Sequence, residues 1–362
     1  MIFDTNITGI ELLAAYKQAF IFGNILTLVI CCPSLFINFF FLIVTLKIKE
    51  IDSTVRFVLI ELTVGMILQA AYLVTRCALT LAYAHYNILC PILSIVQCSV
   101  VEQLLACPAQ VNCLMFVVLA IDRLRVSIWL TFNPKKVSED SVATSIKIIA
   151  GLAHLPAIIL PFLCANFVSS WLDTKPDQSF CEIYLLIDPV LSAFWFSFFF
   201  SWVAFGAGCV AYANIKAGQL MQQYAANQAL LDLRTRILLS RLCETTRSLR
   251  YCLMVQALLH LFICGWGVYR ATFSTNVDRV TVEALYGLKV LHSVLTLVVP
   301  TVCMLSSKRI NTVARDILGF SRSLTPPLED DSEERMKKVE KYWNQHYYMS
   351  RKRENEVKCD TL

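Results

Sequence analysis

The chain has 362 residues, of which 57% are hydrophobic and only 16% charged, and its formal net charge is +5. Soluble domains average roughly 45–50% apolar and about 25% charged residues. A soluble core of this size cannot hide the apolar excess. The composition therefore excludes an ordinary soluble protein and predicts that lipid is the solvent.

Seven long apolar segments, separated by charged loops, follow one another along almost the whole chain. Each is expected to be a helix of about 20 residues, because only internal hydrogen bonding satisfies backbone groups in hydrocarbon. The predicted spans are residues 20–46, 56–83, 92–121, 145–167, 187–215, 249–271 and 282–305. The predicted fold class is an all-α membrane protein, a bundle of seven transmembrane helices.

Lysine and arginine are distributed unequally between the loops on the two sides of these spans. The positive-inside rule places the rich side in the cytoplasm, so the N-terminus is predicted to be outside and the C-terminus inside. A glycosylation sequon at Asn6, on the predicted outer side, agrees with this orientation. The rich side holds Lys47, Lys49, Arg56, Arg123, Arg125, Lys135, Lys136, Lys147, Lys216, Arg234, Arg236, Arg241, Arg247, Arg250, Lys308, Arg309, Arg315 and Arg322. The poor side holds Lys17, Arg76, Lys175, Arg270 and Arg279.

The parts outside the bundle have simpler predictions. Residues 1–19 form an extracellular N-terminus, and residues 20–305 form the membrane domain. Residues 216–248 carry leucines at helical spacing, so the fifth and sixth helices are expected to extend past the bilayer. The spacing of apolar and basic residues in 306–320 predicts an amphipathic helix in the membrane interface.

The C-terminal tail, residues 321–362, is charged and is predicted to be mobile. Its last three residues, Asp360-Thr361-Leu362, match the short strand that a PDZ-type partner takes into its groove. Such short matches also arise by chance.

The end of the third span carries an acid followed by an arginine, Asp122-Arg123. The acid can restrain the arginine, and breaking the pair frees a long cationic side chain. Alternatively, the two are ordinary charges at a cytoplasmic end. Cys98 lies 25 positions before Arg123 (98 to 123), about one membrane span away, at the outer end of the same helix. A disulfide from Cys98 to Cys181 in the second outer loop would tie that loop over the bundle.

These residues resemble the rhodopsin-like G-protein-coupled receptors, and most closely the nematode serpentine chemoreceptors of the Sra-type superfamily. The resemblance covers about residues 15–320. The resemblance rests on Asn38 in the first span, Asp122-Arg123, the interfacial helix, the paired Cys90 and Cys98, and Pro300 late in the seventh span. It implies a receptor bundle, a kink at Pro300, and coupling to a G protein through Asp122 and Arg123.

The chain departs from the usual receptor pattern at several places. Val299-Pro300-Thr301-Val302-Cys303 replaces Asn-Pro-x-x-Tyr, and Leu124 stands where a tyrosine usually follows the acid–arginine pair. The sixth span has Trp266 but no proline after it. Ser293 occupies the position of the retinal lysine, which argues against an opsin. The departures leave open whether activation uses the usual switches.

Charged residues inside the membrane usually mark a pocket, a pair or a pathway. Glu102 and Lys289 both lie in the outer halves of their helices, so they are candidates for an ion pair at the mouth of a ligand pocket. Alternatively, Lys289 extends to the surface and Glu102 faces a loop. The candidate pocket residues are Glu102, Leu105, Trp266, Lys289 and His292.

A second polar group is expected deeper in the bundle, where Glu61 resembles the buried acid of such receptors and faces Asn38 and Asn112. This group is either a hydrated or sodium-binding cluster or a hydrogen-bonded contact between helices. No cysteine or histidine cluster has metal-ligand spacing, so no metal or cofactor is predicted.

The sequence as a whole favours a chemosensory receptor that binds a small molecule and activates a heterotrimeric G protein. It is expected to be a multi-pass glycoprotein of the plasma membrane, such as that of a sensory cilium, and to act in olfaction. Nucleic-acid binding is not expected. Enzymatic activity is not expected either, because no HExxH, GxSxG or paired catalytic acids occur. The alternative is a small-molecule transporter or channel, against which the absence of an internal repeat argues.

Overall fold

In the computed structural model, the described backbone is almost entirely helical. The described residues are 9–48, 51, 53–85, 95–132, 148–152, 154–155, 159, 189–226, 233–273 and 279–320. The chain separates into two units, Met1–Ile317 and Leu318–Leu362, and the helices below all belong to the first. The predicted mobile tail, residues 321–362, and the sequon at Asn6 lie outside the described part, whereas the predicted interfacial segment, residues 306–320, lies within it.

The described helices are α1 (Gly9–Lys47), α2 (Ser53–His85), α3 (Ile95–Phe132), α6 (Pro189–Ala226), α7 (Leu233–Phe273), α8 (Arg279–Ser306) and α9 (Lys308–Ile317). Each long helix covers most or all of a predicted span, but α1 begins earlier, α3 ends later, and α6 and α7 extend beyond their spans as expected. No strand occurs among these residues. Of the span predicted at 145–167, short helical stretches between residues 148 and 159 are described.

Five of the described segments are long and apolar enough to cross a membrane. They are Ile21–Lys47, Ser53–Ala82, Ala193–Leu220, Thr245–Tyr269 and Gly287–Ser306. Their exposed faces carry large apolar side chains such as Phe36, Phe194 and Leu258, each more than 60% exposed. An apolar surface of this extent needs lipid around it. The chain is therefore a helical, multi-pass membrane protein.

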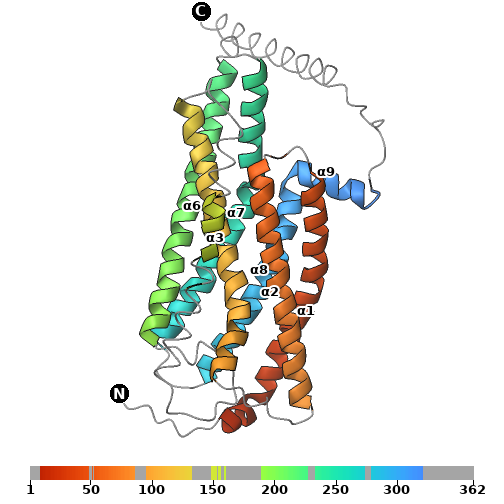
Figure 1. The fold of residues 1–362 in the computed structure, drawn as a ribbon, viewed down its shortest axis with the longest axis vertical. Coiled ribbons are helices and arrows are strands. Elements are labelled where there is room, and N and C mark those ends of the chain that lie inside the picture. Colours follow the sequence, from red (N-terminus) through yellow and green to blue (C-terminus); the bar gives the residue numbers. More distant parts are fainter. Residues whose placement is uncertain are drawn as a thin grey trace, which may run out of the picture. The chain divides into compact units, whose positions relative to one another are not determined.

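The long helices form a closed ring. In order, α1 packs on α2, α2 on α3, α3 on α6, α6 on α7, α7 on α8, and α8 returns to α1 (Figure 1). Helix α3 also contacts α7, so it touches three neighbours. Side chains on α3 are therefore placed to respond to movement of α2, α6 or α7.

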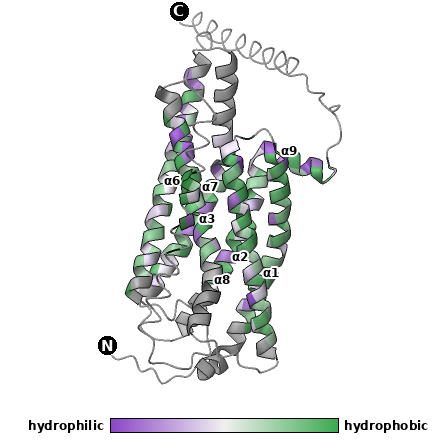
Figure 2. Cartoon of the chain, in the orientation of Figure 1, coloured by the Kyte–Doolittle hydropathy of each residue, from purple (hydrophilic) through white to green (hydrophobic). Residues whose placement is uncertain are grey.

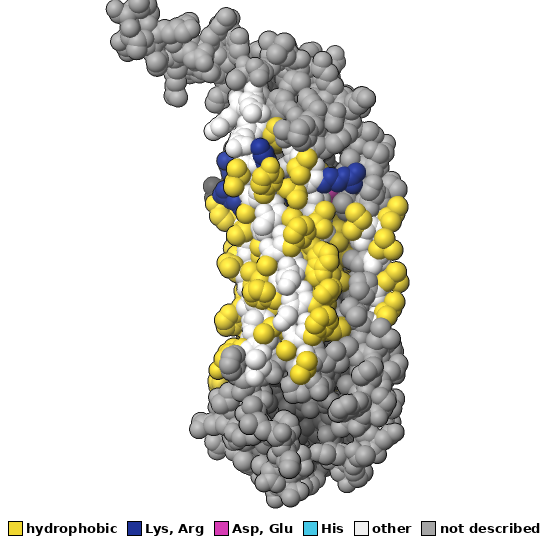
Figure 3. All heavy atoms as spheres, turned by 90° about the vertical axis from the view of Figure 1, so that its left-hand side faces the viewer, with side chains coloured by type: hydrophobic (Ala, Val, Ile, Leu, Met, Phe, Trp, Pro, Cys, Tyr) yellow, Lys and Arg dark blue, Asp and Glu magenta, His cyan; other side chains and the backbone are white. Residues whose placement is uncertain are grey.

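Polar and apolar residues are separated along the ring. Apolar residues dominate the coloured part of the helices, and polar residues become more frequent toward the end near α9 (Figure 2). In Figure 3, hydrophobic side chains cover the middle of one face while lysine and arginine side chains gather at one end. This arrangement matches an apolar belt with a basic boundary.

Two glycines allow aromatic rings to sit deep between helices. A Cβ built on Gly206 of α6 would lie 2.9 Å from Cε1 of Phe116 on α3. A Cβ on Gly267 of α7 would lie 2.4 Å from Cδ1 of Phe196 on α6. The α6 helix is therefore held close to α3 and α7 by rings that fill the space left by missing side chains.

We expect Gly267→Ala to destabilise the bundle, because the Phe196 ring must leave the α6–α7 contact. Overpacking of this kind costs about 1–3 kcal/mol. The matched control is Gly208→Ala on α6, where an added Cβ meets nothing within 4 Å. That variant should keep the wild-type stability or gain slightly, since alanine is the better helix former. Thermal unfolding of the purified protein in detergent checks both, and equal melting temperatures for all three proteins would contradict the packing.

Candidate functional site

The acid–arginine pair of α3 is fully buried. Asp122 is 0% exposed and Arg123 is 1% exposed. Arg123 Nε donates to Asp122 Oδ2 at 2.9 Å, and the Arg123 terminal NH2 nitrogen contacts the same oxygen. A buried charge is tolerated only when it is paired and hydrogen-bonded. The two residues thus neutralise each other inside the protein.

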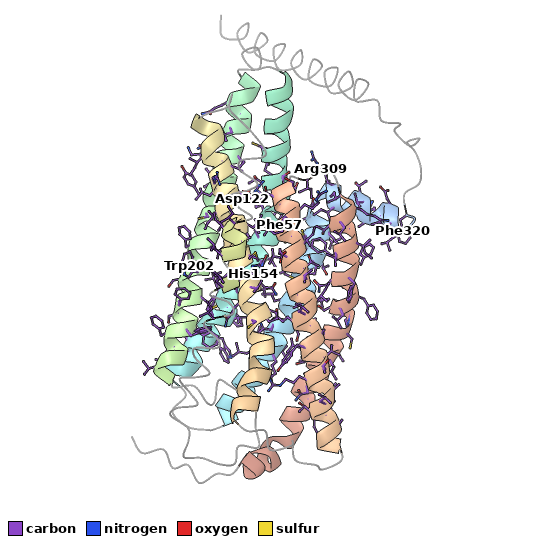
Figure 4. All side chains as sticks on the ribbon, viewed as in Figure 1. Phe57, Asp122, His154, Trp202, Arg309 and Phe320 are labelled. Carbon is purple, nitrogen blue, oxygen red and sulfur yellow. The ribbon has the colours of Figure 1, made fainter. Side chains whose placement is uncertain are left out.

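The pair lies toward one end of the bundle. Figure 4 shows Asp122 on α3 toward the same end as Arg309 of α9. The two partners are consecutive in one helix, so both charges of the ion pair come from α3. Rotation of Arg123 away from Asp122 would present a cation without any movement of the α3 backbone.

A second polar contact joins α1 to α8 at the proline of α8. Pro300 has no backbone N–H, so the carbonyl of Thr296, four residues earlier, lacks its usual helical partner. Asn38 Nδ2 donates to that Thr296 oxygen at 2.8 Å. Ser34 Oγ donates to Thr296 Oγ1 at 3.0 Å, one turn away on α1. Asn38 therefore compensates on α1 for the bond that Pro300 removes from α8.

A third contact links α2, α3 and α8 through Gln69. Its Nε2 donates to His292 Nδ1 at 2.9 Å, and its Oε1 accepts from Asn112 Nδ2 at 3.0 Å. Gly65, one turn away on α2, leaves the space for Asn112, because a Cβ there would lie 2.3 Å from Asn112 Oδ1. Sequence reasoning missed Gln69, although it is the lone amide side chain in its apolar span.

The face of α7 that meets its neighbours is unusually polar for a membrane helix. Ser248, Cys252, Gln256, His260 and Cys264 recur at every fourth position, so neighbouring members lie one above the other in a stripe that winds slowly around α7. Gln256 is 1% exposed, and within the described residues neither Nε2 nor Oε1 of its amide has a hydrogen-bond partner. His260 packs edge-on against Phe116, with ring centroids 6.3 Å apart. The α7 contact surface is therefore polar and only partly hydrogen-bonded.

The predicted polar group of Asn38, Glu61 and Asn112 is distributed over separate contacts. Asn38 bonds to α8 and Asn112 to Gln69, as above. Glu61 is one-third exposed, and its Oε2 lies 3.6 Å from Nε2 of His154. The opposite nitrogen of that ring, Nδ1, donates to the Ala150 carbonyl at 2.8 Å. Glu61 thus connects α2 to the helical stretch near residue 150.

The predicted ligand-pocket residues are partly described. Trp266 on α7 is half-buried and stacks on Tyr269 with centroids 5.6 Å apart. Its Nε1 lies 3.8 Å from the Cβ position of Gly287 on α8. Lys289 is buried and His292 half-buried, both on α8. These three residues come from the adjacent helices α7 and α8.

The remaining predicted residues, those of the disulfide and of the Glu102–Lys289 ion pair, are described only in part. Glu102, Leu105 and Cys98 belong to the described backbone of α3, but their side chains lie outside the described part. Cys181 lies outside the described residues altogether. The Cys98–Cys181 disulfide and the Glu102–Lys289 pair therefore stay predictions. Across the described residues, no three His, Cys, Asp or Glu side chains gather in a way that could hold a metal ion.

A scan of the chain against protein-family models and a search of the curated proteins each found no match.

The Asn38–Thr296 bond predicts a specific non-additivity. Asn38→Ala leaves the Thr296 carbonyl unpaired in the interior, which costs about 1–3 kcal/mol. Pro300→Ala supplies a backbone N–H that can bond to the same carbonyl. Asn38→Ala should therefore cost clearly less in the Pro300→Ala background than in the wild type.

The measurement is a double-mutant cycle of thermal unfolding on four purified proteins: the wild type, both single variants and the double variant. Thr301→Ala gives a control on α8, because the Thr301 hydroxyl donates within its own helix, to the Leu297 carbonyl at 2.7 Å. That control should show no coupling to Asn38. An equal cost of Asn38→Ala in both backgrounds would contradict the assigned role of Asn38.

Proposed function

We propose that this protein is a chemosensory G-protein-coupled receptor. In this proposal the chain crosses the plasma membrane seven times, with the N-terminus outside, and binds a small molecule within the helix bundle. The observation that carries the proposal is the fully buried Asp122–Arg123 pair on α3. Arg123 is a buried, paired cation on α3, the helix that contacts α2, α6 and α7. Movement of these helices can therefore control whether Arg123 stays paired with Asp122.

The charge distribution supports the proposed orientation. Arg125 and Arg247 are exposed near the end of the bundle that holds Arg123, and Lys308 is exposed on α9. Under the positive-inside rule this basic end faces the cytoplasm. The cytoplasmic end is also where an α subunit of a G protein would dock, with its C-terminal helix in the crevice beside Arg123.

The proposed ligand pocket lies toward the other end, around Trp266, Lys289 and His292. Trp266 and His260 are on α7, six residues apart, so a ligand against Trp266 acts on the helix that carries the polar face. Within the described residues, the buried Gln256 amide on that face has no hydrogen-bond partner. A ligand that binds better when α7 is displaced would shift the population toward the displaced state by its differential affinity alone.

In the displaced state, the inner end of α7 opens a crevice beside α3. Arg123 then leaves Asp122 and reaches the docked partner. A transporter or channel would share the bundle but would have no use for an arginine whose restraint is released at one end. The function is therefore best tested at this pair.

We expect Arg123→Ala to lower ligand-stimulated G-protein activation at least tenfold, because the cation that meets the partner is gone. Arg125→Ala is the matched control, since Arg125 is two residues away and exposed. It should keep most of the activation. Surface expression, measured alongside by antibody to an N-terminal tag, separates loss of signalling from loss of folding.

Asp122→Asn should have the opposite effect. An asparagine still hydrogen-bonds but no longer holds the arginine by charge, so ligand-independent activation should rise several-fold above the wild type. G-protein activation in cells without added ligand measures this rise. Full ligand-stimulated activation by Arg123→Ala at normal surface expression would exclude a receptor that signals through Arg123.

A further inference from the structure

The Gln256 side chain of α7 is a buried amide without a hydrogen-bond partner. It is 1% exposed, and within the described residues neither its Nε2 nor its Oε1 is hydrogen-bonded. A buried donor and a buried acceptor that are both left unpaired destabilise a protein, and such groups are rare in native structures. An unpaired amide of this kind calls for a partner in another state of the bundle.

The direction of the Gln256 side chain follows from its neighbours on α7. Four residues before it, the Cys252 thiol donates to the Val299 carbonyl of α8 at 3.7 Å. Four residues after it, the His260 ring packs against Phe116 of α3, with ring centroids 6.3 Å apart. Each step of four residues turns the side chain by about 40° beyond a full turn. Gln256 therefore points between α8 and α3, toward the middle of the ring.

Arg123 lies on the face of α3 that meets α7. Arg123 and Phe116 are seven residues apart, which is nearly two full turns, so they share one face of the helix. The Phe116 ring meets His260 of α7 and also fills the space beside Gly206 of α6. Because Arg123 is 1% exposed, its side chain stays inside the bundle on this face.

The helices α3 and α7 run in opposite directions. Contacts between α3 and α6 advance together along both helices, whereas contacts between α6 and α7 advance along one helix and recede along the other. The contacts are Phe116 with Gly206, Ser127 with Ala213, Phe196 with Gly267, and Phe200 with Gly265. The N-terminal ends of α3 and α7 therefore lie at opposite ends of the bundle.

Gln256 and Arg123 consequently approach each other from opposite directions. Gln256 is one turn from His260, toward the basic end of the bundle. On α3, one turn from Phe116 in the same direction, lies Ala120, and Arg123 is three residues or about 4.5 Å further on. Helical side chains lean toward the N-terminus of their own helix. The arginine thus leans back to the level of Ala120, and the glutamine leans toward the arginine.

We propose that Gln256 is a positioning residue, whose amide oxygen accepts a hydrogen bond from Arg123 when Arg123 leaves Asp122. In the closed ring, Arg123 Nε donates to Asp122 Oδ2 at 2.9 Å, and the Gln256 amide is unpaired. A guanidinium carries five N–H donors, so a bond to Gln256 leaves others for a docked partner. The role in signalling rests on the proposed function, whereas the exchange of partners does not.

The exchange predicts that one substitution has opposite effects on stability in two backgrounds. In the wild type, Gln256→Leu should raise the melting temperature by a few degrees, because it removes an unpaired buried amide. In the Asp122→Asn background, Gln256→Leu should lower the melting temperature, because the amide then holds the arginine. Thermal unfolding of the four purified full-length proteins in detergent measures both effects.

Gln110→Leu is the matched control. Gln110 is also buried, but it lies on α3 13 positions before Arg123 (110 to 123), about 20 Å away. Its effect on the melting temperature should be the same in both backgrounds. A second control combines Asp122→Asn with Arg123→Ala. In that background Gln256→Leu should again raise the melting temperature, because no arginine is left to hold.

Three results would overturn the proposal. The first is an equal effect of Gln256→Leu in the wild type and in Asp122→Asn. The second is a reversal of sign that persists after Arg123→Ala, which would assign the amide a different partner. The third is a lower melting temperature of Gln256→Leu in the wild type, which would show that the amide is already bonded, for example to water. Gln256→Met provides a second apolar variant if Gln256→Leu does not fold.

A signalling measurement separates this role from the proposed function. Gln256→Leu should lower the raised ligand-independent activation of Asp122→Asn several-fold at equal surface expression, and Gln110→Leu should leave it unchanged. If Gln256→Leu leaves that activation intact, the role of Gln256 in signalling is refuted. If the stability effect reverses but no variant activates a G protein, the proposed function fails and the exchange of partners stands.

Discussion

The closed ring of helices depends on polar contacts, because lipid gives apolar helix faces little reason to prefer one another. The clearest contact is the bond from Asn38 Nδ2 to the Thr296 carbonyl. It exists because Pro300 leaves that carbonyl without a helical partner. A local defect in α8 thus becomes the point at which α8 is attached to α1, and the ring is closed there.

Polar contacts between helices also distinguish α7 from the rest of the ring. Between α2, α3 and α8, the single side chain of Gln69 uses its donor and its acceptor to connect His292 and Asn112. On α7, the buried amide of Gln256 has no partner within the described residues. Amide and hydroxyl side chains therefore join α1 to α8 and α2 to α3 and α8, whereas α7 meets α8 through the Cys252 thiol and the Ser306 hydroxyl, each bonded to a backbone carbonyl.

The sequence predicts the helices better than the contacts between them. Hydropathy alone places α1, α2, α6, α7 and α8, because continuous apolar runs can satisfy their backbones only as helices. It also predicts that α6 and α7 extend beyond the apolar belt, as their ends at Ala226 and Leu233 show. Asp122 and Arg123 are visible as a pair because they are adjacent in the chain.

Contacts between helices depend on the rotation of each helix, which the sequence does not specify. Glu61 was expected to face Asn38 and Asn112, yet one turn separates it from Gly65, the residue that Asn112 approaches. Gln69, two turns beyond Glu61, makes the contact instead. A shift of two turns along one helix is enough to exchange an acid for an amide. Whether Glu61 or Gln69 contacts Asn112 therefore depends on how the neighbouring helices are positioned.

The ion pair of α3 has a consequence for how such a protein can change over evolutionary time. Arg123 and its restraining carboxylate are neighbours in the chain, so substitutions in other helices do not remove the carboxylate. Residues around Trp266 can then be substituted without disturbing the Asp122–Arg123 ion pair at the opposite end of the bundle. A local restraint of this kind suits a lineage in which the recognised chemical changes often and the output stays the same.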